Sequence, residues 1–188
     1  MPLTLSGNGT ISDLASAPTV GGTALPTNLS DLGIANHNNI SVDSSGRMTN
    51  GSQPVVNARL STSQSIANQT RVKVNFNTID DQNGSNYSTA NQRFTAPVTG
   101  YYSINTHLYI YSVSKAEVYL YKNGSLSLRM ANMEASGNVN PNGAFLNHIV
   151  KLTEGDYVEI WAYQTSGSTQ TIYTSTDKPT YLSIMLIG

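Results

Sequence analysis

A turn followed by strict alternation of side chains, in residues 94–111, constrains the fold more than any other segment of this chain. Pro97 and Gly100 favour a turn, and apolar and polar side chains alternate from Gly100 onward. Alternate side chains of a strand point to opposite faces of its sheet. One face would carry mostly apolar side chains, those of Tyr102, Ile104, Thr106, Leu108 and Ile110. The pattern predicts a long strand of a β-sandwich, with this face toward the core.

Several other segments have the length and composition of strands, and turn-forming residues separate them. The predicted strands are residues 55–60, 72–76, 93–95, 100–112, 116–121, 126–132, 143–152, 156–163, 170–173 and 180–187. Asn123 and Gly124 form a pair that favours the positive backbone angles of a two-residue hairpin turn. No long stretch has helical periodicity. The sequence therefore predicts an all-β domain, an antiparallel sandwich, over residues 59–188.

Residues 1–58 differ in character, because they contain many glycines and prolines and lack sustained periodicity. A disordered tail is one interpretation. The regular supply of apolar side chains favours another, an extended N-terminal arm that becomes ordered against a partner. The candidate docking residues of this arm are Leu3, Leu5, Ile11, Leu14, Leu25, Leu29, Leu32 and Ile34.

The composition argues against several classes of function. The net charge is −1 and only 11% of residues are charged, whereas nucleic-acid-binding proteins usually have an excess of basic residues. The chain has no cysteine, so it forms neither a disulfide nor a thiolate metal site. No apolar run approaches the ~20 residues that span a bilayer, and the first residues lack the pattern of a secretory signal. We therefore expect no nucleic-acid partner, no membrane insertion and synthesis in the cytoplasm.

Residue types that carry catalysis or bind cofactors do not form a recognisable motif. The histidines, His37, His107 and His148, have neither metal-ligand spacing nor an accompanying nucleophile motif. No glycine-rich phosphate loop occurs. The segment from Asp80 to Asn86 is rich in side-chain oxygens, but its order does not match a calcium-binding loop. We interpret it as a solvated turn and leave cation binding open. The sequence predicts no catalytic residue, no cofactor, no metal site and no enzymatic activity.

Residues 60–187 resemble the globular domain of the complement C1q family. The shared pattern is a turn and strand, a hairpin, and a second turn and strand, in the same order and at similar spacing. In this chain it consists of Phe94, Pro97, Gly100, Tyr102, Leu120, Lys122, Asn123, Gly124, Leu152, Gly155, Asp156 and Val158. Ile184 departs from the pattern, because the family commonly has glycine there. The resemblance implies a jelly roll similar to tumour necrosis factor, which works as a homotrimer and serves binding or structure rather than catalysis.

Tyrosine is abundant, with eleven copies, and several tyrosines fall on predicted strands opposite the core face. A tyrosine buries a large ring and keeps a polar tip, which suits partly wet interfaces. These rings could pack locally on their own sheet, stack on sugars or line a contact between subunits. Because the resemblance implies a trimer, we favour a subunit contact for part of this set. The candidates are Tyr109, Tyr111, Tyr119, Tyr121 and Tyr163.

The stretch of residues 40–49, followed by Gln53 and Pro54, resembles the lead-in to such domains in structural proteins of tailed bacteriophages. A surface rich in Asn, Ser and Thr and the lack of cysteine and of a signal agree with a virion protein. We expect a trimeric capsid decoration (cement) protein on the particle surface, made in the host cytoplasm. Its arm would dock on the major capsid protein or on tail proteins. The alternative is a tail or head fibre that recognises host surface glycans.

Overall fold

The computed structural model describes residues 19–20, 23–24, 40–42, 45, 48–110, 113–139, 142–177 and 180–187. The chain divides into two units, Met1–Gly51 and Ser52–Gly188. The first unit contains two antiparallel strand pairs, β1 (Thr19–Val20) with β2 (Thr23–Ala24) and β3 (Ile40–Val42) with β4 (Met48–Asn50). The eight candidate docking residues of the arm lie outside the described residues, so their role stays a prediction.

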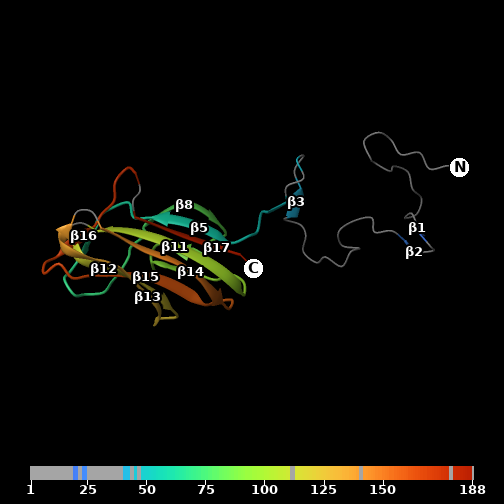
Figure 1. Cartoon of the computed structure of the whole chain (residues 1–188). Coiled ribbons are helices and arrows are strands. Elements are labelled where there is room, and N and C mark those ends of the chain that lie inside the picture. Colours follow the sequence, from blue (N-terminus) through green and yellow to red (C-terminus); the bar gives the residue numbers. More distant parts are fainter. Residues whose placement is uncertain are drawn as a thin grey trace. The chain divides into compact units, whose positions relative to one another are not determined.

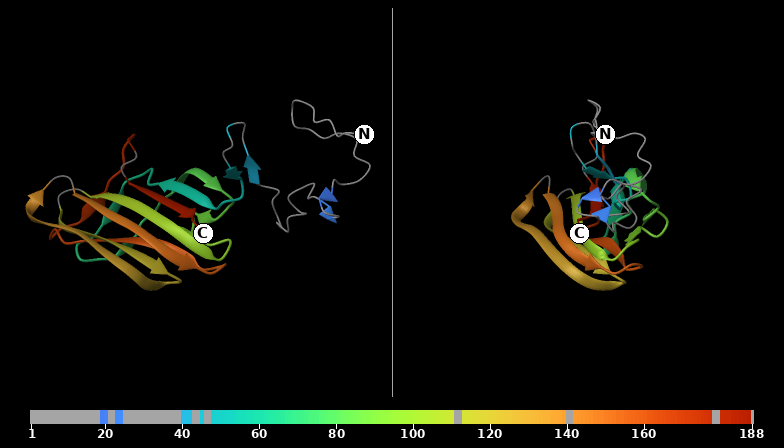
Figure 2. Two further views of the ribbon diagram at one scale, coloured as in Figure 1. Left: turned by 45° about the vertical axis from the view of Figure 1, so that its right-hand side comes forward. Right: turned by 90° about the vertical axis from the view of Figure 1, so that its right-hand side faces the viewer.

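The second unit is a sandwich of two antiparallel sheets that lie face to face (Figure 1 and Figure 2). The first sheet has the order β13 (Ser125–Val139), β12 (Val113–Lys122), β15 (Tyr157–Gln164), β10 (Arg93–Thr95) and β9 (Tyr87–Ser88), with β7 (Val72–Lys73) also paired to β15. The second sheet has the order β6 (Gln64–Ile66), β16 (Gln170–Ile172), β11 (Gly100–Ile110), β17 (Tyr181–Leu186), β5 (Val55–Arg59) and β8 (Thr78–Asn83), with β14 (Asn142–Leu152) also paired to β11. The prediction of an all-β antiparallel sandwich is confirmed.

The core lies between the two sheets and is built by the alternation that the sequence shows. Along β11 every second residue is buried, and the predicted core face is the buried one. Ile104 and Leu108 of this strand join Val118 and Leu120 of β12 in one apolar cluster. Ile184, which departs from the C1q pattern, is also buried in this cluster. Burying such aliphatic side chains contributes about 1.5–3 kcal/mol each, so these alternating positions supply much of the driving force for folding.

The three segments that carry the C1q resemblance meet at one end of the sandwich. Ala96, after β10, and Asp156, before β15, are joined by a backbone hydrogen bond of 2.8 Å. The side chain of Asn123 donates to Asp156 Oδ1 at 2.7 Å and accepts from the backbone N–H of Tyr157 at 2.8 Å. Asp156 Oδ2 also accepts the N–H of Thr153 at 2.8 Å. These polar contacts explain physically why residues so far apart in sequence form one pattern.

The predicted two-residue hairpin connects β12 and β13. Asn123 and Gly124 both have positive φ, 51° and 76°, as a tight turn between twisted strands requires. Asn tolerates the left-handed region better than most residues, and its side chain here also makes the contacts described above. The sequence-based prediction of this turn is confirmed.

The second unit begins at Ser52, and β5 pairs with β17 and β8 inside it. The structure differs from the sequence-based expectations at the segment from Asp80 and at the short strands β6 and β9, which the pattern does not predict. The segment from Asp80 was interpreted as a turn, but residues 78–83 form the edge strand β8. Asp80 lies at an irregularity in the register, and its carboxylate accepts a hydrogen bond from Arg59 Nε at 2.8 Å. Apolar and polar residues do not alternate along β8, because an edge strand is largely exposed to water and buries few of its side chains.

Candidate functional site: the outer face of the second sheet

The face of the second sheet that points away from the core exposes several large apolar side chains among polar ones. The register places side chains of β14, β11, β17 and β5 in rows across the sheet. An aromatic row ends on an arginine and consists of Phe145, His107, Tyr181 and Arg59. A polar row consists of Asn147, Asn105, Ser183 and Asn57. An aliphatic row, interrupted by one serine, consists of Ile149, Ser103, Met185 and Val55. We call these rows, with Tyr101 and Ile187 beyond them, the outer face of the second sheet.

Large side chains on this face are exposed to a degree that is unusual for apolar groups. Phe145 and Ile149 are each 54% exposed, Met185 44% and Tyr181 43%. They lie on β14 and β17, which flank β11, and the polar row separates Phe145 and Tyr181 from Ile149 and Met185. The charged groups on the rows are few, and Arg59 is held by Asp80. Exposed apolar patches are rare on monomeric proteins and mark surfaces that bind something.

His107 anchors the aromatic row. Its ring stacks on Phe145 with a centroid distance of 4.4 Å and an interplanar angle of 22°. Tyr181 and Tyr109 flank it at centroid distances of 6.2 Å and 6.4 Å. The ring occupies the space beside Gly143, where an added Cβ would lie 2.3 Å from His107 Nε2. A glycine on β14 therefore makes room for a flat aromatic surface, and His107 serves packing in this position.

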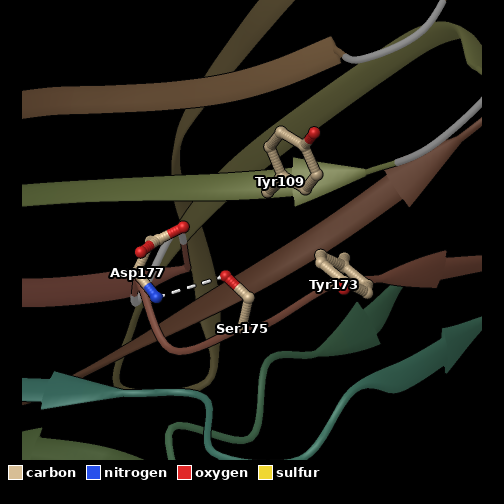
Figure 3. A pocket seen from close by; sticks show the side chains of 4 residues that line it. All are labelled: Tyr109, Tyr173, Ser175 and Asp177. Carbon is tan, nitrogen blue, oxygen red and sulfur yellow. Dashed lines mark hydrogen bonds between the residues drawn. The ribbon is translucent and has the colours of Figure 1, made fainter.

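A pocket of about 380 Å³ opens at one end of the face (Figure 3). Tyr109 of β11 and Tyr173, which follows β16, contribute rings whose centroids are 5.8 Å apart. Ser175 and Asp177 contribute polar groups from the following loop, where the N–H of Asp177 donates to Ser175 Oγ at 3.3 Å. Two rings beside a hydroxyl and a carboxylate suit a ligand that has both a flat apolar face and hydrogen-bonding groups.

The predicted tyrosine contacts are divided between the two sheets. Tyr109 belongs to the outer face of the second sheet, whereas Tyr119, Tyr121 and Tyr163 lie on β12 and β15 of the first sheet. Tyr119 is only 2% exposed, so its own subunit already covers it. Tyr111 lies outside the described residues. The structure therefore does not bring the predicted tyrosines together on one surface.

Sequence reasoning missed the apolar residues that dominate this face. Phe145, Ile149, Tyr181 and Met185 alternate with buried residues on β14 and β17, so the signal was the same as on β11. Among the described residues, no group of three or more His, Asp or Glu side chains could hold a metal ion. No helix among them has the length and hydropathy of a membrane span.

Comparison with solved structures gives the same architecture. The globular domain of zebrafish complement 1qA protein matches with a TM-score of 0.53 and 16% identity, over 72% of this chain and 98% of that one. A crystal structure of murine APRIL at pH 8.0 matches with a TM-score of 0.54 and 13% identity, over 72% and 99%. Eiger TNF from S. frugiperda matches with a TM-score of 0.51 and 10% identity, over 72% and 92%. At these identities the likeness concerns the fold.

Two comparisons concern the sequence itself. The uncharacterized protein YqcC of Bacillus subtilis (strain 168) is 29% identical over 112 residues, which are 56% of this chain. The match spans 31% of that relative's length, so most of that relative has no counterpart in this chain. The model of the C1q domain family matches residues 57–186, which include nearly all of the sandwich. The chain therefore belongs to the C1q domain family.

Proposed function

We propose that this protein is a structural protein of a bacteriophage particle, where its C1q domain forms a homotrimeric knob and acts as a capsid decoration protein. The observation that carries self-association is the exposed apolar face formed by β14, β11, β17 and β5. Covering that face with two neighbouring copies removes Phe145, Ile149 and Met185 from water. The outer face is then an interface rather than a catalytic site.

The composition of the face suits contact between copies. Its rows carry few charges, so little desolvation of charge opposes burial. The polar row of Asn147, Asn105, Ser183 and Asn57 crosses the middle of the patch. Amides and hydroxyls both donate and accept, so the same row on a second copy can satisfy them, and it would fix the register of the subunits. The number of three subunits follows from the C1q resemblance.

The particle role rests on other observations. Residues 40–49 resemble the segment that precedes such domains in structural proteins of tailed phages, and the surface is rich in Asn, Ser and Thr. The N-terminal arm supplies apolar residues for docking on capsid or tail subunits. Three arms on one trimer would raise the strength of a weak contact through effective concentration. A short arm with one compact domain suits decoration of a capsid better than a long fibre.

Self-association is tested by placing a charge in the patch. Ile149→Asp and Phe145→Asp should each convert the trimer to monomer, because a buried carboxylate without a partner is costly at the interface. Leu126→Asp is the matched control, since Leu126 is 48% exposed but belongs to the first sheet. Mass by sedimentation equilibrium gives the readout. A wild-type protein that stays monomeric at all concentrations would contradict the proposal.

Docking through the arm is tested by deletion of residues 1–35. The shortened protein should keep its fold and its trimeric mass but no longer join particles of the parent virus. Circular dichroism and sedimentation report the fold and the mass, and co-purification with particles reports docking. Retained attachment would show that the arm is not the docking element. Microscopy of the particles with symmetry averaging would locate the full-length protein on the capsid or at the tail.

The pocket beside Tyr109 and Tyr173 favours a second candidate function, a fibre or receptor-binding module for host surface glycans. Aromatic rings stack on the apolar faces of sugars, and Ser175 and Asp177 offer hydrogen bonds to hydroxyl groups. Tyr173→Ala should then abolish saturable binding of host polysaccharide while the mass of the trimer stays unchanged. Binding at wild-type strength by this variant would reject the pocket as the glycan site.

A further inference from the structure

The outer face of the first sheet differs in chemistry from that of the second. The register places four side chains of β15 along its centre, Tyr157, Glu159, Trp161 and Tyr163. On one side β12 contributes Tyr121 opposite Glu159, Tyr119 opposite Trp161 and Glu117 opposite Tyr163. On the other side Lys73 of β7 lies opposite Trp161, with Arg71 one residue before β7. Aromatic rings and charged groups therefore alternate across this face.

Positive charge gathers on this face, although the whole chain has a net charge of −1. Among the described side chains, the cations are Arg71, Lys73, Arg93, Lys115 and Arg129 and the carboxylates are Glu117 and Glu159, a difference of 5 − 2 = +3. The register also places Glu134 of β13 opposite Lys115, which lowers the difference to +2. Lys122 and Asp156, at the end of the sheet, form a pair of their own at 2.8 Å and do not change this difference.

The two carboxylates are already occupied within the face. Glu117, only 1% exposed, accepts hydrogen bonds from Tyr119 and Arg129 and lies 3.1 Å from Lys115 Nζ. Glu159 pairs with Lys73 Nζ at 2.6 Å and accepts from Trp161 Nε1 at 3.2 Å. Arg71 and Arg93 have no such partner among the described residues, so their charge remains available for a ligand.

The guanidinium groups of Arg71 and Arg93 each lie over a tyrosine ring. Arg71 Cζ lies 4.6 Å from the centre of the Tyr119 ring, and its Nη1 donates to Tyr121 Oη at 3.3 Å. Arg93 Cζ lies 4.3 Å from the centre of the Tyr157 ring. Contact with a ring limits the positions that each guanidinium can take, and arginine can bind a carboxylate through two parallel N–H donors.

An aromatic pair lies between the cations. The rings of Tyr121 and Trp161 are 5.2 Å apart with an interplanar angle of 37°, and Lys73 Nζ is 5.7 Å from the Trp161 ring. Both side chains are partly exposed. Neighbouring positions of this row along a strand are about 7 Å apart, which is the length of two residues. Successive charged groups and aromatic rings along a strand of this face therefore follow one another at distances of about 7 Å.

We propose that the outer face of the first sheet binds an acidic polysaccharide. Arg71 and Arg93 would pair with carboxylates of the polymer, and Trp161 and Tyr121 would pack against its sugar rings. A duplex nucleic acid carries a charge every ~1.7 Å and calls for a longer basic surface than one with a net charge of +2. The face lies on the opposite side of the sandwich from the outer face of the second sheet, so each subunit offers it whether or not the subunits assemble.

Trp161 is the sole tryptophan of the chain, so its fluorescence reports on this face directly. Titration of the full-length protein with polygalacturonate should change the Trp161 emission and give a saturable curve that weakens as salt is raised. Neutral dextran should give no change. Polyglutamate, which has carboxylates but no sugar rings, should bind at least tenfold more weakly than polygalacturonate.

The double variant Arg71→Gln/Arg93→Gln should lose at least tenfold in affinity for polygalacturonate. The matched control is Arg47→Gln/Lys151→Gln, which removes the same charge from the unit Met1–Gly51 and from β14 and should keep wild-type affinity. Sedimentation of each sample gives its mass, so loss of assembly is separated from loss of binding. No binding, equal loss in the control, or binding of single-stranded DNA or polyglutamate as tight as that of polygalacturonate would overturn the proposal.

Discussion

Gly143 shows how a single residue shapes the outer face of the second sheet. A glycine inside a strand normally weakens it, so alanine would be the better residue on local grounds. Here the added Cβ would lie 2.3 Å from His107 Nε2 and 3.1 Å from Phe145 Cζ. We predict that Gly143→Ala costs about 1 kcal/mol of unfolding free energy, as overpacking does. The same substitution in a His107→Ala background should cost less, because only the approach to Phe145 then remains. Urea unfolding at one protein concentration measures both, and equal costs would refute the packing role.

Glu117 supports a prediction about pH. Burial raises the pKa of its carboxyl, but hydrogen bonds from Tyr119, Arg129 and Lys115 outweigh burial and hold the pKa below its ordinary value of 4.5. A carboxyl with a lowered folded-state pKa stabilises the fold above the unfolded pKa, and this stability is lost as pH falls through the folded pKa. Glu117→Gln should therefore destabilise by about 1–3 kcal/mol at pH 7.

The difference between wild type and Glu117→Gln should shrink as pH falls below 4.5, because the wild-type carboxyl becomes protonated. Unfolding free energies across pH 2.5–7, a range set about the unfolded pKa of roughly 4.3, measure this. Asp80→Asn is the control, since its pair with Arg59 is partly exposed and such pairs contribute at most about 1 kcal/mol. A difference that does not change with pH would contradict the prediction.

At the scale of residues, the sequence identified which side chains lie on a face but not what covers it. Tyr119 was correctly placed opposite the core by alternation, yet Arg71 lies over its ring and leaves it 2% exposed. Arg71 precedes the two-residue strand β7, which is too short to show a period. Coverage of this kind depends on contacts between segments distant in the chain, and single-residue patterns carry no information about them.

At the scale of elements, the hairpin between β12 and β13 gives a prediction that separates two effects. Asn123→Gly keeps the ease of positive φ but loses the contacts with Asp156 and Tyr157, whereas Asn123→Ala loses both. We expect Asn123→Ala to be the less stable variant by about 1 kcal/mol, the typical cost of the left-handed region for a residue with a Cβ. Chemical denaturation measures both. Equal stability would show that the backbone angle is not limiting.

The long strands were predictable, whereas among the short ones β10 and β16 were predicted and β6 and β9 were not. β11, β14 and β15 each contain at least four alternations, so their patterns were recognised with ends within two residues of those found. β6 and β9 have three and two residues, and they exist because neighbouring strands supply hydrogen-bonding partners. Pairing with a distant strand is not recorded in the local pattern, which explains why these edge strands were missed.

At the scale of the whole molecule, each of the two outer faces has its own proposed function. The apolar face of the second sheet suits contact with other copies, and the cationic, aromatic face of the first sheet suits an acidic ligand. The sequence could predict a sandwich, but it could not predict which sheet has the apolar exterior. That property depends on the register between strands that are up to about 130 residues apart, such as β5 and β17.

Self-association should appear in thermal stability as a concentration dependence. Folding coupled to assembly follows mass action, so the Tm of the wild-type protein should rise as its concentration is raised. The Tm of Ile149→Asp should stay constant over the same range, because this variant is expected to be monomeric. Differential scanning fluorimetry over two orders of magnitude of concentration measures both. A wild-type Tm that does not change with protein concentration would contradict self-association coupled to folding.

The position of β17 has a consequence for the order of events during synthesis. This strand is formed by residues 181–186 but lies between β11 and β5 in the middle of its sheet. On the ribosome, β5 and β11 emerge long before the strand that joins them. Until β17 leaves the exit tunnel, both carry an open edge that can pair with other nascent chains. Folding of this domain can therefore be completed only after nearly all of it has been translated. Incorrect pairing between nascent chains is most probable where several ribosomes translate one message close together.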